Sequence, residues 1–351
     1  MIIPEETQAK SLAERGDEMK RKRKVPLAIK ILLIILALLV LTAGILYGYV
    51  FYKVGSIEKV DTSQEERIDP SKESFETDED IPENVTEMEE SQITWEGADP
   101  DVMKDKEVVN ILLIGQDRRE GESRQRSDSM ILVTINKETK KLSMTSFMRD
   151  LYVQIPGYSD NRLNAAYAFG GMSLLDETLQ KNFGISVDGN VEVDFEGFVG
   201  CIDTLGGVDI TLNQAEAAYL NDPSLKEGAN HLNGEQALRY SRIRSVGNAD
   251  YERTERQRRV LTAVFDKFKN ADIATIMNTV NSLIPYLTTD MSTSQILGYA
   301  LEVFQTGARS VDSYRVPVDG GYTPAVIRGM MVLVPDLKVN QDYLKNQLYG
   351  N

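Results

Sequence analysis

Residues 31–52 form an uncharged, mostly apolar run of 22 residues, ILLIILALLVLTAGILYGYVFY. A run of this kind can cross a bilayer as a single α-helix, which needs about 20 apolar residues. Tyr47, Tyr49 and Tyr52 stand at one end of it, as aromatic residues do at membrane interfaces. A cleaved signal peptide is the alternative, but the run is long for one and no clear A-x-A site accompanies it.

The charges on either side of this run predict its orientation. Residues 1–53 carry 9 basic and 5 acidic side chains, and five consecutive basic residues occupy 20–24. Basic residues favour the cytoplasmic side. We therefore expect a cytoplasmic tail at 1–30, one transmembrane helix at 31–52, and the rest of the chain outside the cell membrane.

The next segment is strongly acidic. Residues 54–106 carry 5 basic and 18 acidic side chains, a net charge of −13, and few apolar groups. Such a composition cannot offset its ordering entropy by burial. It predicts a disordered tether at 53–106, followed by one folded domain at 107–351.

From residue 108 the sequence alternates between strand and helix patterns. The expected strands are 108–115, 130–136, 141–147, 151–156, 191–195, 207–212, 311–316 and one near 328–333. The expected helices are 164–169, 173–183, 196–205, 234–243 with Asn233 as its cap, 250–270, 272–286, 293–306 and 336–349. This interleaving is typical of an α/β fold, here a three-layer domain with a central mixed β-sheet flanked by helices.

The composition excludes several kinds of site. The chain has one cysteine and one histidine, which excludes an internal disulfide framework and Cys-rich or His-rich metal sites. A general base would then most readily be a carboxylate. The formal net charge of −15 is unlike that of a nucleic-acid-binding protein, so we expect no nucleic acid among the partners.

Arginines cluster in residues 239–259, which hold seven of the 20 in the chain. The planar guanidinium fork suits phosphate and carboxylate. Arg253 and Gln257 are i and i+4 and share a helix face, while Arg242 and Arg244 belong to the end of the preceding helix and the loop after it. The alternative is a solvated helix face with local ion pairs, such as Glu252 with Arg256.

A second polar segment, GQDRREGESRQRSDS at 115–129, follows a strand. Asp117 and Asp128 stand near its two ends with four arginines between them, and both carboxylates could meet one Mg²⁺ or Mn²⁺ ion. The alternative is an exposed polar loop.

Two further segments carry weaker signals. Arg149 and Asp150 lie between two expected strands, a weak signal alone. The segment 162–171 predicts a helix that stops at Gly170-Gly171.

Together these segments outline a pyrophosphate site, in which arginines hold the oxygens and a cation neutralises developing charge. Neither a P-loop nor a G-x-G-x-x-G motif is present, so a nucleotide is not the obvious owner of the phosphates.

Seven ordered motifs between residues 108 and 265 make the chain resemble the LytR-CpsA-Psr family of bacterial cell-envelope enzymes. They are NILLIGQDRR, RSDSMILVTIN, SFMRDLYVQIPG, LNAAYAFGG, VDFEGFVGCIDTLGGVDI, LNGEQALRYSRIR and DYERTERQRRVL. The resemblance implies that 107–351 is an extracytoplasmic catalytic domain of this family, with an apolar tunnel for a lipid chain.

The resemblance also implies an activity and its residues. Family members move an anionic glycopolymer, such as a teichoic acid or capsular polysaccharide, from a polyprenyl-pyrophosphate carrier to peptidoglycan. The metal-binding carboxylates would be Asp117 and Asp128. The catalytic residues would be Asp117 and Arg149. The pyrophosphate-contacting residues would be Arg126, Arg149, Arg242, Arg244, Arg253 and Gln257.

Two other functions stay open at this point. One is hydrolysis of polyprenyl pyrophosphates with water as acceptor, and the other is a non-catalytic polyprenyl-phosphate-binding regulator of the envelope. Asp117 could act as the base for the acceptor hydroxyl or only as a metal ligand.

Overall fold

The computed structural model describes residue 44 and residues 47–79, 81–82, 85–116, 124–247 and 249–350. The chain divides into two units, residues 1–50 and 51–351. The described residues of the first unit are helical, and the predicted tail and most of the predicted span lie outside the described residues. In the part of the chain that the structure describes, no helix has the length and apolarity required to span a membrane.

A seven-stranded mixed sheet forms the centre of the second unit, in the order β1-β11-β8-β3-β4-β5-β12. The hairpins β3–β4 and β4–β5 are antiparallel, and so is the β8–β11 pair. The pairs β3–β8, β5–β12 and β1–β11 are parallel. The bounds are β1 Glu58–Lys59, β3 Val108–Gln116, β4 Ser127–Asn136, β5 Lys141–Phe147, β8 Gly189–Val193, β11 Leu287–Thr289 and β12 Val311–Val316.

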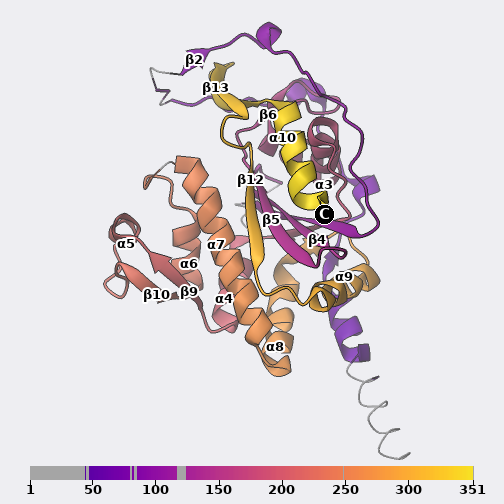
Figure 1. The fold of residues 1–351 in the computed structure, drawn as a ribbon, viewed down its shortest axis with the longest axis vertical. Helices are drawn as coiled ribbons and strands as arrows, with labels where there is room; N and C mark the ends of the chain where they lie inside the picture. Colours follow the sequence, from indigo (N-terminus) through magenta and orange to yellow (C-terminus); the bar gives the residue numbers. More distant parts are fainter. Residues whose placement is uncertain are drawn as a thin grey trace, which may run out of the picture. The chain divides into compact units, whose positions relative to one another are not determined.

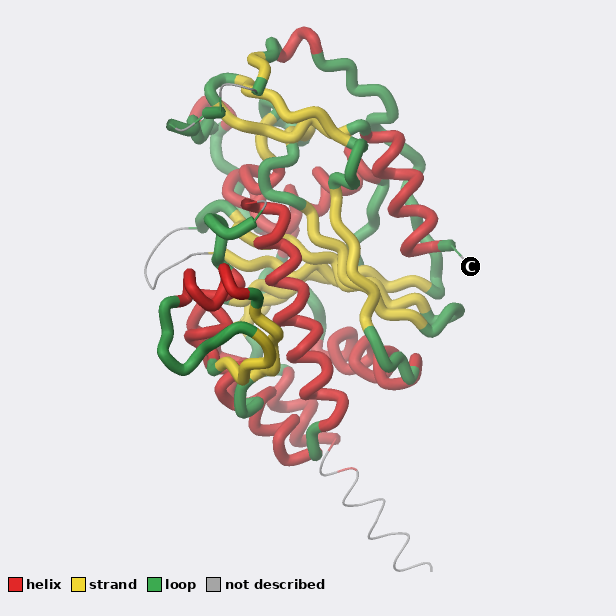
Figure 2. Tube along the Cα trace, turned by 60° about the vertical axis from the view of Figure 1, so that its left-hand side comes forward, coloured by secondary structure: helices red, strands yellow, loops and turns green. Residues whose placement is uncertain are grey.

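Helices cover both faces of this sheet (Figures 1 and 2). Successive side chains of a strand point to opposite faces, and β3 has buried side chains on both faces of the sheet. Leu112 and Ile114 are fully buried in one core with α3 and α10, whereas Val109 packs in a second core with Phe265 of α7 and Val303 of α9. The helix bounds are α3 Leu163–Phe183, α7 Ala249–Asn270, α8 Ile273–Leu283, α9 Thr293–Thr306 and α10 Leu337–Leu344. The predicted α/β fold with a mixed central sheet is therefore confirmed.

A smaller group of elements packs beside α7 with a core of its own. It consists of α4 Phe195–Thr204, β9 Val208–Leu212, α5 Gln214–Leu220, β10 Gly228–Leu232 and α6 Gly234–Ser241. Asn233 caps α6 as predicted, because its side chain accepts from the Gln236 N–H and the Gln236 side chain accepts in return. This group brings residues 239–244 beside α7.

A second sheet contains the hairpin β13 Tyr322–Ile327 and β14 Met330–Pro335, with β2 Thr86–Glu87 added to it. The strand predicted near 328–333 corresponds to β14, which begins two residues later, and β13 was not predicted. Arg328 and Gly329 both have positive φ, 52° and 73°, and so form the turn between two strands, as tight hairpin turns require. The short elements are β6 Tyr152–Val153, β7 Asn161–Arg162, η1 Thr62–Gln64, η2 Pro70–Lys72, η3 Glu90–Gln92, η4 Ile284–Tyr286 and the π-helix η5 Lys345–Tyr349.

The acidic segment before β3 makes specific contacts with the rest of this unit, a finding that departs from the disordered tether expected at 53–106. The Trp95 indole donates to Asp160 at 2.8 Å, and Asp78 forms an ion pair with Arg162. The Ile68 N–H donates to the Phe169 carbonyl at 2.8 Å. Composition alone could not reveal these partners, because tertiary structure brings them to the segment.

Gly170 and Gly171 interrupt α3, in agreement with the predicted stop. Gly171 has φ +70°, and a Cβ there would lie 1.9 Å from a Glu65 oxygen. The Glu65 carboxylate accepts from the N–H groups of Met172 and Ser173 at 3.1 and 2.8 Å. It thereby caps the second half of the helix from far away in the sequence, where free N–H groups need acceptors.

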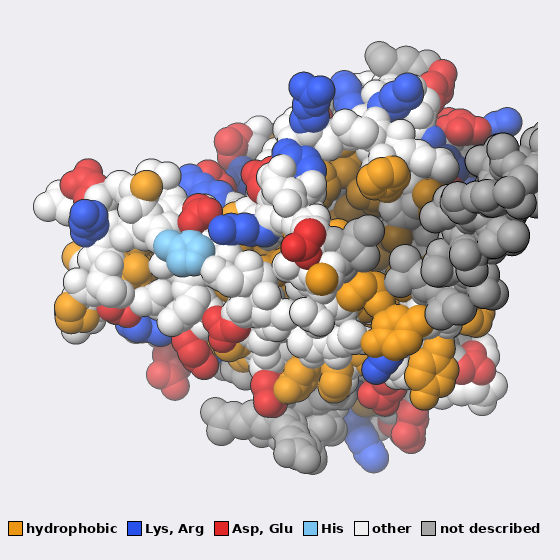
Figure 3. Space-filling model, turned by 90° about the horizontal axis from the view of Figure 1, so that it is seen from below, with side chains coloured by type: hydrophobic (Ala, Val, Ile, Leu, Met, Phe, Trp, Pro, Cys, Tyr) orange, Lys and Arg blue, Asp and Glu red, His pale blue; other side chains and the backbone are white. Residues whose placement is uncertain are grey.

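The surface of the domain mixes charges of both signs. In the view from below, acidic and basic side chains are interspersed, and hydrophobic side chains gather in one part of that face (Figure 3). Leu301 and Phe304 of α9 are among the large hydrophobic side chains that are exposed.

We expect Glu65→Ala to lower the free energy of unfolding by about 1–2 kcal/mol, as loss of a helix cap does. The exposed neighbour provides the control, since Glu66→Ala should change stability by less than about 0.5 kcal/mol. Urea unfolding of the full chain in detergent measures both. Equal effects of the two substitutions would mean that the acidic segment is not held against α3.

Candidate active site

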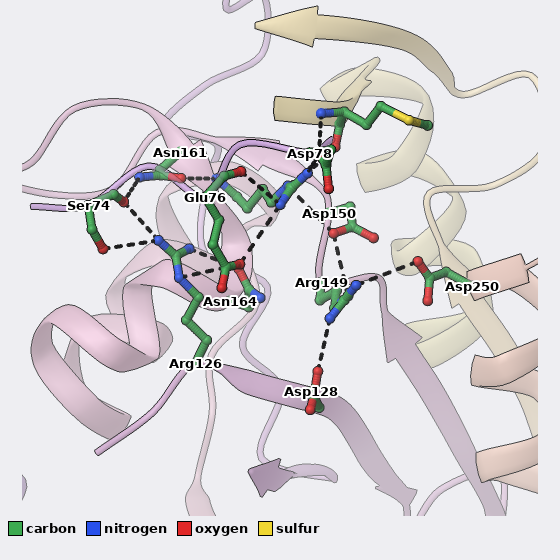
Figure 4. A network of polar contacts seen from close by, with 12 residues as sticks. Ser74, Glu76, Asp78, Arg126, Asp128, Arg149, Asp150, Asn161, Asn164 and Asp250 are labelled. Atoms are coloured by element: carbon green, nitrogen blue, oxygen red, sulfur yellow. Dashed lines mark hydrogen bonds and ion pairs between the residues drawn. The ribbon is translucent and has the colours of Figure 1, made fainter. Parts of the chain in front are cut away.

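The site lies at one edge of the central sheet, where three separate segments meet. β3 and β4 pair so that Gln116 stands opposite Ser127 at this edge. Asp128 is the second residue of β4, and Arg149 follows the end of β5. The first turn of α7 supplies Asp250 beside them (Figure 4).

Two carboxylates join three guanidinium groups here. Asp128 Oδ1 lies 3.0 Å from Arg149 Nη1 and 3.6 Å from Arg244 Nη2. Asp250 lies 3.0 Å from Arg253 Nη1, 3.5 Å from Arg244 Nε and 3.9 Å from Arg149 Nη2. A third carboxylate, Asp150, also contacts Arg149, so the charges of these six groups balance when all are ionised.

Asp150 extends the network toward the N-terminal segment. It lies 3.5 Å from Arg149 Nε and 3.6 Å from Arg162 Nε. Burial raises the pKa of Asp150 to about 6, Arg149 opposes this rise, and the neighbouring Asp250 carboxylate, which is hydrogen-bonded to Asp150, adds to it. The two carboxyl groups can therefore share a proton in mildly acidic solution.

The ion pairs of Asp250 and Arg149 also determine the direction of their pKa shifts. Burial disfavours the charge of Asp250, but Arg253, Arg149 and Arg244 outweigh it and hold its pKa below the ordinary value. Burial likewise disfavours the charge of Arg149, but Asp150, Asp250 and Asp128 raise the pKa of this guanidinium. Both groups are therefore ionised at neutral pH.

Arg253 is the most buried cation of the network, with a side chain that is only 3% exposed. Burial lowers the pKa of Arg253 to about 10, and Asp250 offsets this only in part. Its Nε and Nη1 atoms are buried without a well-formed hydrogen bond. Nη1 has the Asp250 carboxylate at 3.0 Å, whereas no acceptor for Nε is found among the described residues. Buried donors in native proteins are nearly always paired, so Nε is suited to an acceptor from a ligand.

A cavity of about 690 Å³ opens beside these charges. Its polar wall is Asp128, Ser129, Asp194, Arg239, Ser241, Arg242, Arg244, Ser245, Arg253 and Gln257. Its other wall is largely apolar and consists of Leu113, Ile114, Gly115, Ile131, Val193, Phe195, Phe198, Tyr219, Leu238 and Leu261. The cavity can thus hold a molecule with an anionic end and a hydrocarbon end.

Most of the sequence-predicted site residues come together here. Arg149, Arg244 and Arg253 belong to the network of ion pairs with Asp128 and Asp250. Gln257 lines the cavity and accepts a hydrogen bond from Ser129 at 3.2 Å. The guanidinium of Arg242 lies over the Phe195 ring at 4.6 Å, on the cavity wall.

One predicted residue, Arg126, stands apart from this group. Arg126 is held by the N-terminal segment, since it donates to the Ser74 carbonyl at 2.7 Å and lies 3.7 Å from Glu76. It also donates to Asn164 at 3.3 Å and does not line the cavity (Figure 4). Asp117 lies outside the described residues.

Sequence reasoning missed Asp250 and undervalued Asp150. The only available signal for Asp250 was its place three residues before Arg253 on the same helix face. The expected local ion pair of Glu252 with Arg256 is present at 2.6 Å. Arg256 also binds the buried Glu216 at 2.8 Å, so this arginine of the 239–259 cluster stabilises the fold and is not part of the cavity.

A model of the LytR_cpsA_psr family matches residues 63–347. The chain belongs to this family. One relative is polyisoprenyl-teichoic acid–peptidoglycan teichoic acid transferase TagT of Bacillus subtilis (strain 168), which is 30% identical over 348 residues that cover 96% of this chain and 99% of TagT. Another is regulatory protein MsrR of Staphylococcus aureus, 34% identical over 222 residues, which are 63% of this chain and 68% of MsrR.

Solved structures of LytR-CpsA-Psr proteins share the fold. TagT bound to LI-WTA has a TM-score of 0.59 and 28% identity, covering 72% of this chain and 96% of that one. YwtF (TagT) with bound octaprenyl pyrophosphate lipid has a TM-score of 0.55 and 27% identity, with the same coverage. The family membership inferred from the seven motifs is therefore confirmed.

The raised pKa of Asp150 gives a testable pH dependence of this member's stability. A carboxyl whose pKa is higher in the folded chain stabilises the fold when protonated, and that stabilisation is lost as pH rises from about 4 to about 6. We expect the stability of the native chain, measured relative to Asp150→Asn, to fall by about 2 kcal/mol between pH 4 and 7. Urea unfolding at both pH values tests this, and parallel pH profiles would contradict it.

Proposed function

We propose that this protein is a phosphotransferase that moves an anionic glycopolymer of the teichoic acid or capsular polysaccharide type from a polyprenyl-pyrophosphate carrier to peptidoglycan. The observation that carries the proposal is a cavity with one largely apolar wall and one wall in which four arginines face two carboxylates. A polyprenyl pyrophosphate has the matching parts, a hydrocarbon chain and a diphosphate. The relatives support the same reading, because TagT is a teichoic acid transferase by name and has been solved with octaprenyl pyrophosphate.

The arginines would bind and orient the diphosphate. Arg253, Arg244 and Arg149 present donors from different directions, and Gln257 and Arg242 stand on the cavity wall. Donors that are fixed before the substrate arrives stabilise charge that develops during transfer. The apolar wall would hold the polyprenyl chain away from water and so fix the diphosphate beside the arginines.

In the proposed reaction, a hydroxyl oxygen of the peptidoglycan glycan attacks the phosphorus that bears the glycopolymer. A new P–O bond forms, the P–O bond to the polyprenyl phosphate breaks, and polyprenyl phosphate leaves. The hydroxyl proton is transferred to a base, for which we propose Asp117 because the chain lacks cysteine and histidine suited to that role. One P–O bond replaces another, so the oxidation state of phosphorus does not change.

We propose that Asp117 and Asp128 hold a Mg²⁺ or Mn²⁺ ion. Carboxylate oxygens suit these ions, and Mg²⁺ commonly fills its remaining positions with water and substrate phosphate. Among the described residues no three His, Cys, Asp or Glu side chains are grouped as metal ligands, so a site built on Asp128 would need such outside oxygens. When bound, the ion would neutralise charge on the phosphates.

We place the domain outside the cell membrane, with one span at 31–52 and a cytoplasmic N-terminus. This placement rests on the apolar run and its flanking charges. It would bring the cavity to the side of the membrane where peptidoglycan is found.

The function is tested by product analysis with a synthetic polyprenyl-pyrophosphate-linked glycan and a peptidoglycan fragment. We expect mass spectrometry to show a phosphodiester-linked glycan from the native chain and none from Asp117→Ala, which should remain folded by circular dichroism. A free phosphorylated glycan would instead show a hydrolase. Absence of turnover with retained lipid binding would show a binding protein. Full transfer by Asp117→Ala would remove the proposed role of this residue.

Ligand binding gives a separate prediction. Arg253→Gln should weaken farnesyl pyrophosphate binding by about 1.5–3 kcal/mol, because a charge-assisted phosphate contact is lost. Arg309→Gln, which removes an exposed arginine outside the cavity, should leave the dissociation constant unchanged. Titration calorimetry measures both, and equal behaviour of the two variants would contradict the assignment of the site.

Metal binding can be measured without turnover. We expect Mn²⁺ to bind the native chain in the presence of farnesyl pyrophosphate, as followed by electron paramagnetic resonance, and to bind Asp128→Asn more weakly. The control is Asp266→Asn, which removes an exposed carboxylate at the far end of α7. The same Mn²⁺ affinity in Asp128→Asn and the native chain would remove Asp128 as a ligand.

A further inference from the structure

A second groove lies on the opposite face of α7 from the cavity. α7 lines the cavity with Arg253, Gln257 and Leu261, which follow one another at i and i+4. It lines the groove with Glu255, Arg258, Arg259, Thr262, Ala263, Asp266, Lys267 and Asn270. At about 3.6 residues per turn, these two sets fall on opposite sides of the helix. The groove has a volume of about 1120 Å³.

Most charges on this face of α7 are neutralised locally. Arg259 forms an ion pair with Glu255, and Lys267 Nζ lies 3.1 Å from an Asp209 oxygen. Arg258 is the exception, because no carboxylate of the described part of the chain is within ion-pair distance of it. Its Nε donates to Ser313 Oγ at 2.5 Å.

Arg258 is 7% exposed, and its Nη1 is buried without a hydrogen-bond partner. Burial lowers the pKa of Arg258 to about 10; Glu255 opposes this shift only in part, and the nearby cations Arg315 and Arg259 add to it. Leaving a buried charge without a counter-ion is costly. The protein therefore keeps an uncompensated cation in the wall of an open groove.

The other walls of the groove are rich in hydroxyl groups. Thr211 of β9, Thr275 of α8 and Ser313 of β12 line it together with Thr262 of α7, and Asn270 contributes an amide. Hydroxyl and amide groups both donate and accept hydrogen bonds, which matches the hydroxyl groups of a sugar. A guanidinium in addition matches a carboxylate or phosphate.

We propose that this groove binds an anionic saccharide, with Arg258 facing its phosphate or carboxylate group. The inference rests on the proposed function, in which both substrates contain such saccharides. α7 is about 10 Å across with its side chains, so a glycan of a few sugar units could extend from the cavity edge to the groove. The groove would then hold the glycan while the diphosphate is held on the other face of the same helix.

Two sources share this chemistry and need separate probes. The donor polymer would present phosphodiesters, for which a short glycerol phosphate oligomer is the probe. The acceptor would present carboxylates, for which a GlcNAc–MurNAc dipeptide is the probe. Titration of the full chain in detergent with each probe measures their dissociation constants.

We expect at least one probe to bind the native chain and Arg258→Gln to weaken that binding at least about tenfold, as expected for loss of one charge-assisted contact. Thr262→Glu should weaken probe binding as well. Residue 262 is i+4 from Arg258, so its new carboxylate would form an ion pair with the guanidinium and compete with the probe. Lys269→Gln, which removes a charge from α7 outside the groove, should have no effect.

The melting temperature separates a binding role from a structural one. Since Arg258 has no counter-ion, Arg258→Gln should unfold at or above the native temperature. If Arg258→Gln does not fold, the binding measurement on Thr262→Glu tests the proposal in its place, because this variant retains Arg258.

The proposal is overturned if neither probe binds at millimolar concentration, or if binding is the same in Arg258→Gln, Thr262→Glu and the native chain. Farnesyl pyrophosphate distinguishes this failure from failure of the proposed function. It should bind Arg258→Gln as tightly as the native chain, and its failure to bind the native chain would count against the cavity and not against the groove.

Discussion

The candidate site depends on one carboxylate, Asp250. It lies within 4 Å of Arg149, Arg244 and Arg253, which come from the end of β5, the loop after α6 and α7 itself. Without a shared anion, three guanidinium groups this close would repel one another in a partly buried place. Asp250 allows them to converge, and the cavity beside them keeps an excess of positive charge, because four arginines and two carboxylates line it.

The helix that carries Asp250 also organises what surrounds the site. α7 packs on β12 and β5 of the central sheet and on β9 of the smaller group, so it joins the central sheet to that group. One face lines the apolar cavity and the other lines the groove with Arg258. A single helix thereby fixes the distance between the proposed lipid-pyrophosphate site and the proposed saccharide groove, as transfer between two long substrates would require.

The parts of the fold that depend on local pattern could be predicted from the sequence. β3 is an apolar-rich run of strand length, β5 and β12 coincide with the strands predicted at 141–147 and 311–316, and Asn233 begins a helix by a local cap. Parts that depend on remote partners could not. Glu65 looks like one more acidic residue of a soluble segment until α3 brings two N–H groups to it. Asp250 likewise has no distinctive neighbours in the sequence, because two of its three arginines reach it only through tertiary structure.

The central claim is that a diphosphate binds at the arginines around Asp250 while its lipid chain enters the apolar cavity. A crystal structure of the protein with a prenyl pyrophosphate tests this most directly. The account predicts phosphate oxygens within about 2.7–2.9 Å of guanidinium nitrogens of Arg244 or Arg253, and prenyl carbons against Phe198 and Leu261. A diphosphate bound elsewhere on the domain, with this cavity empty, would contradict it.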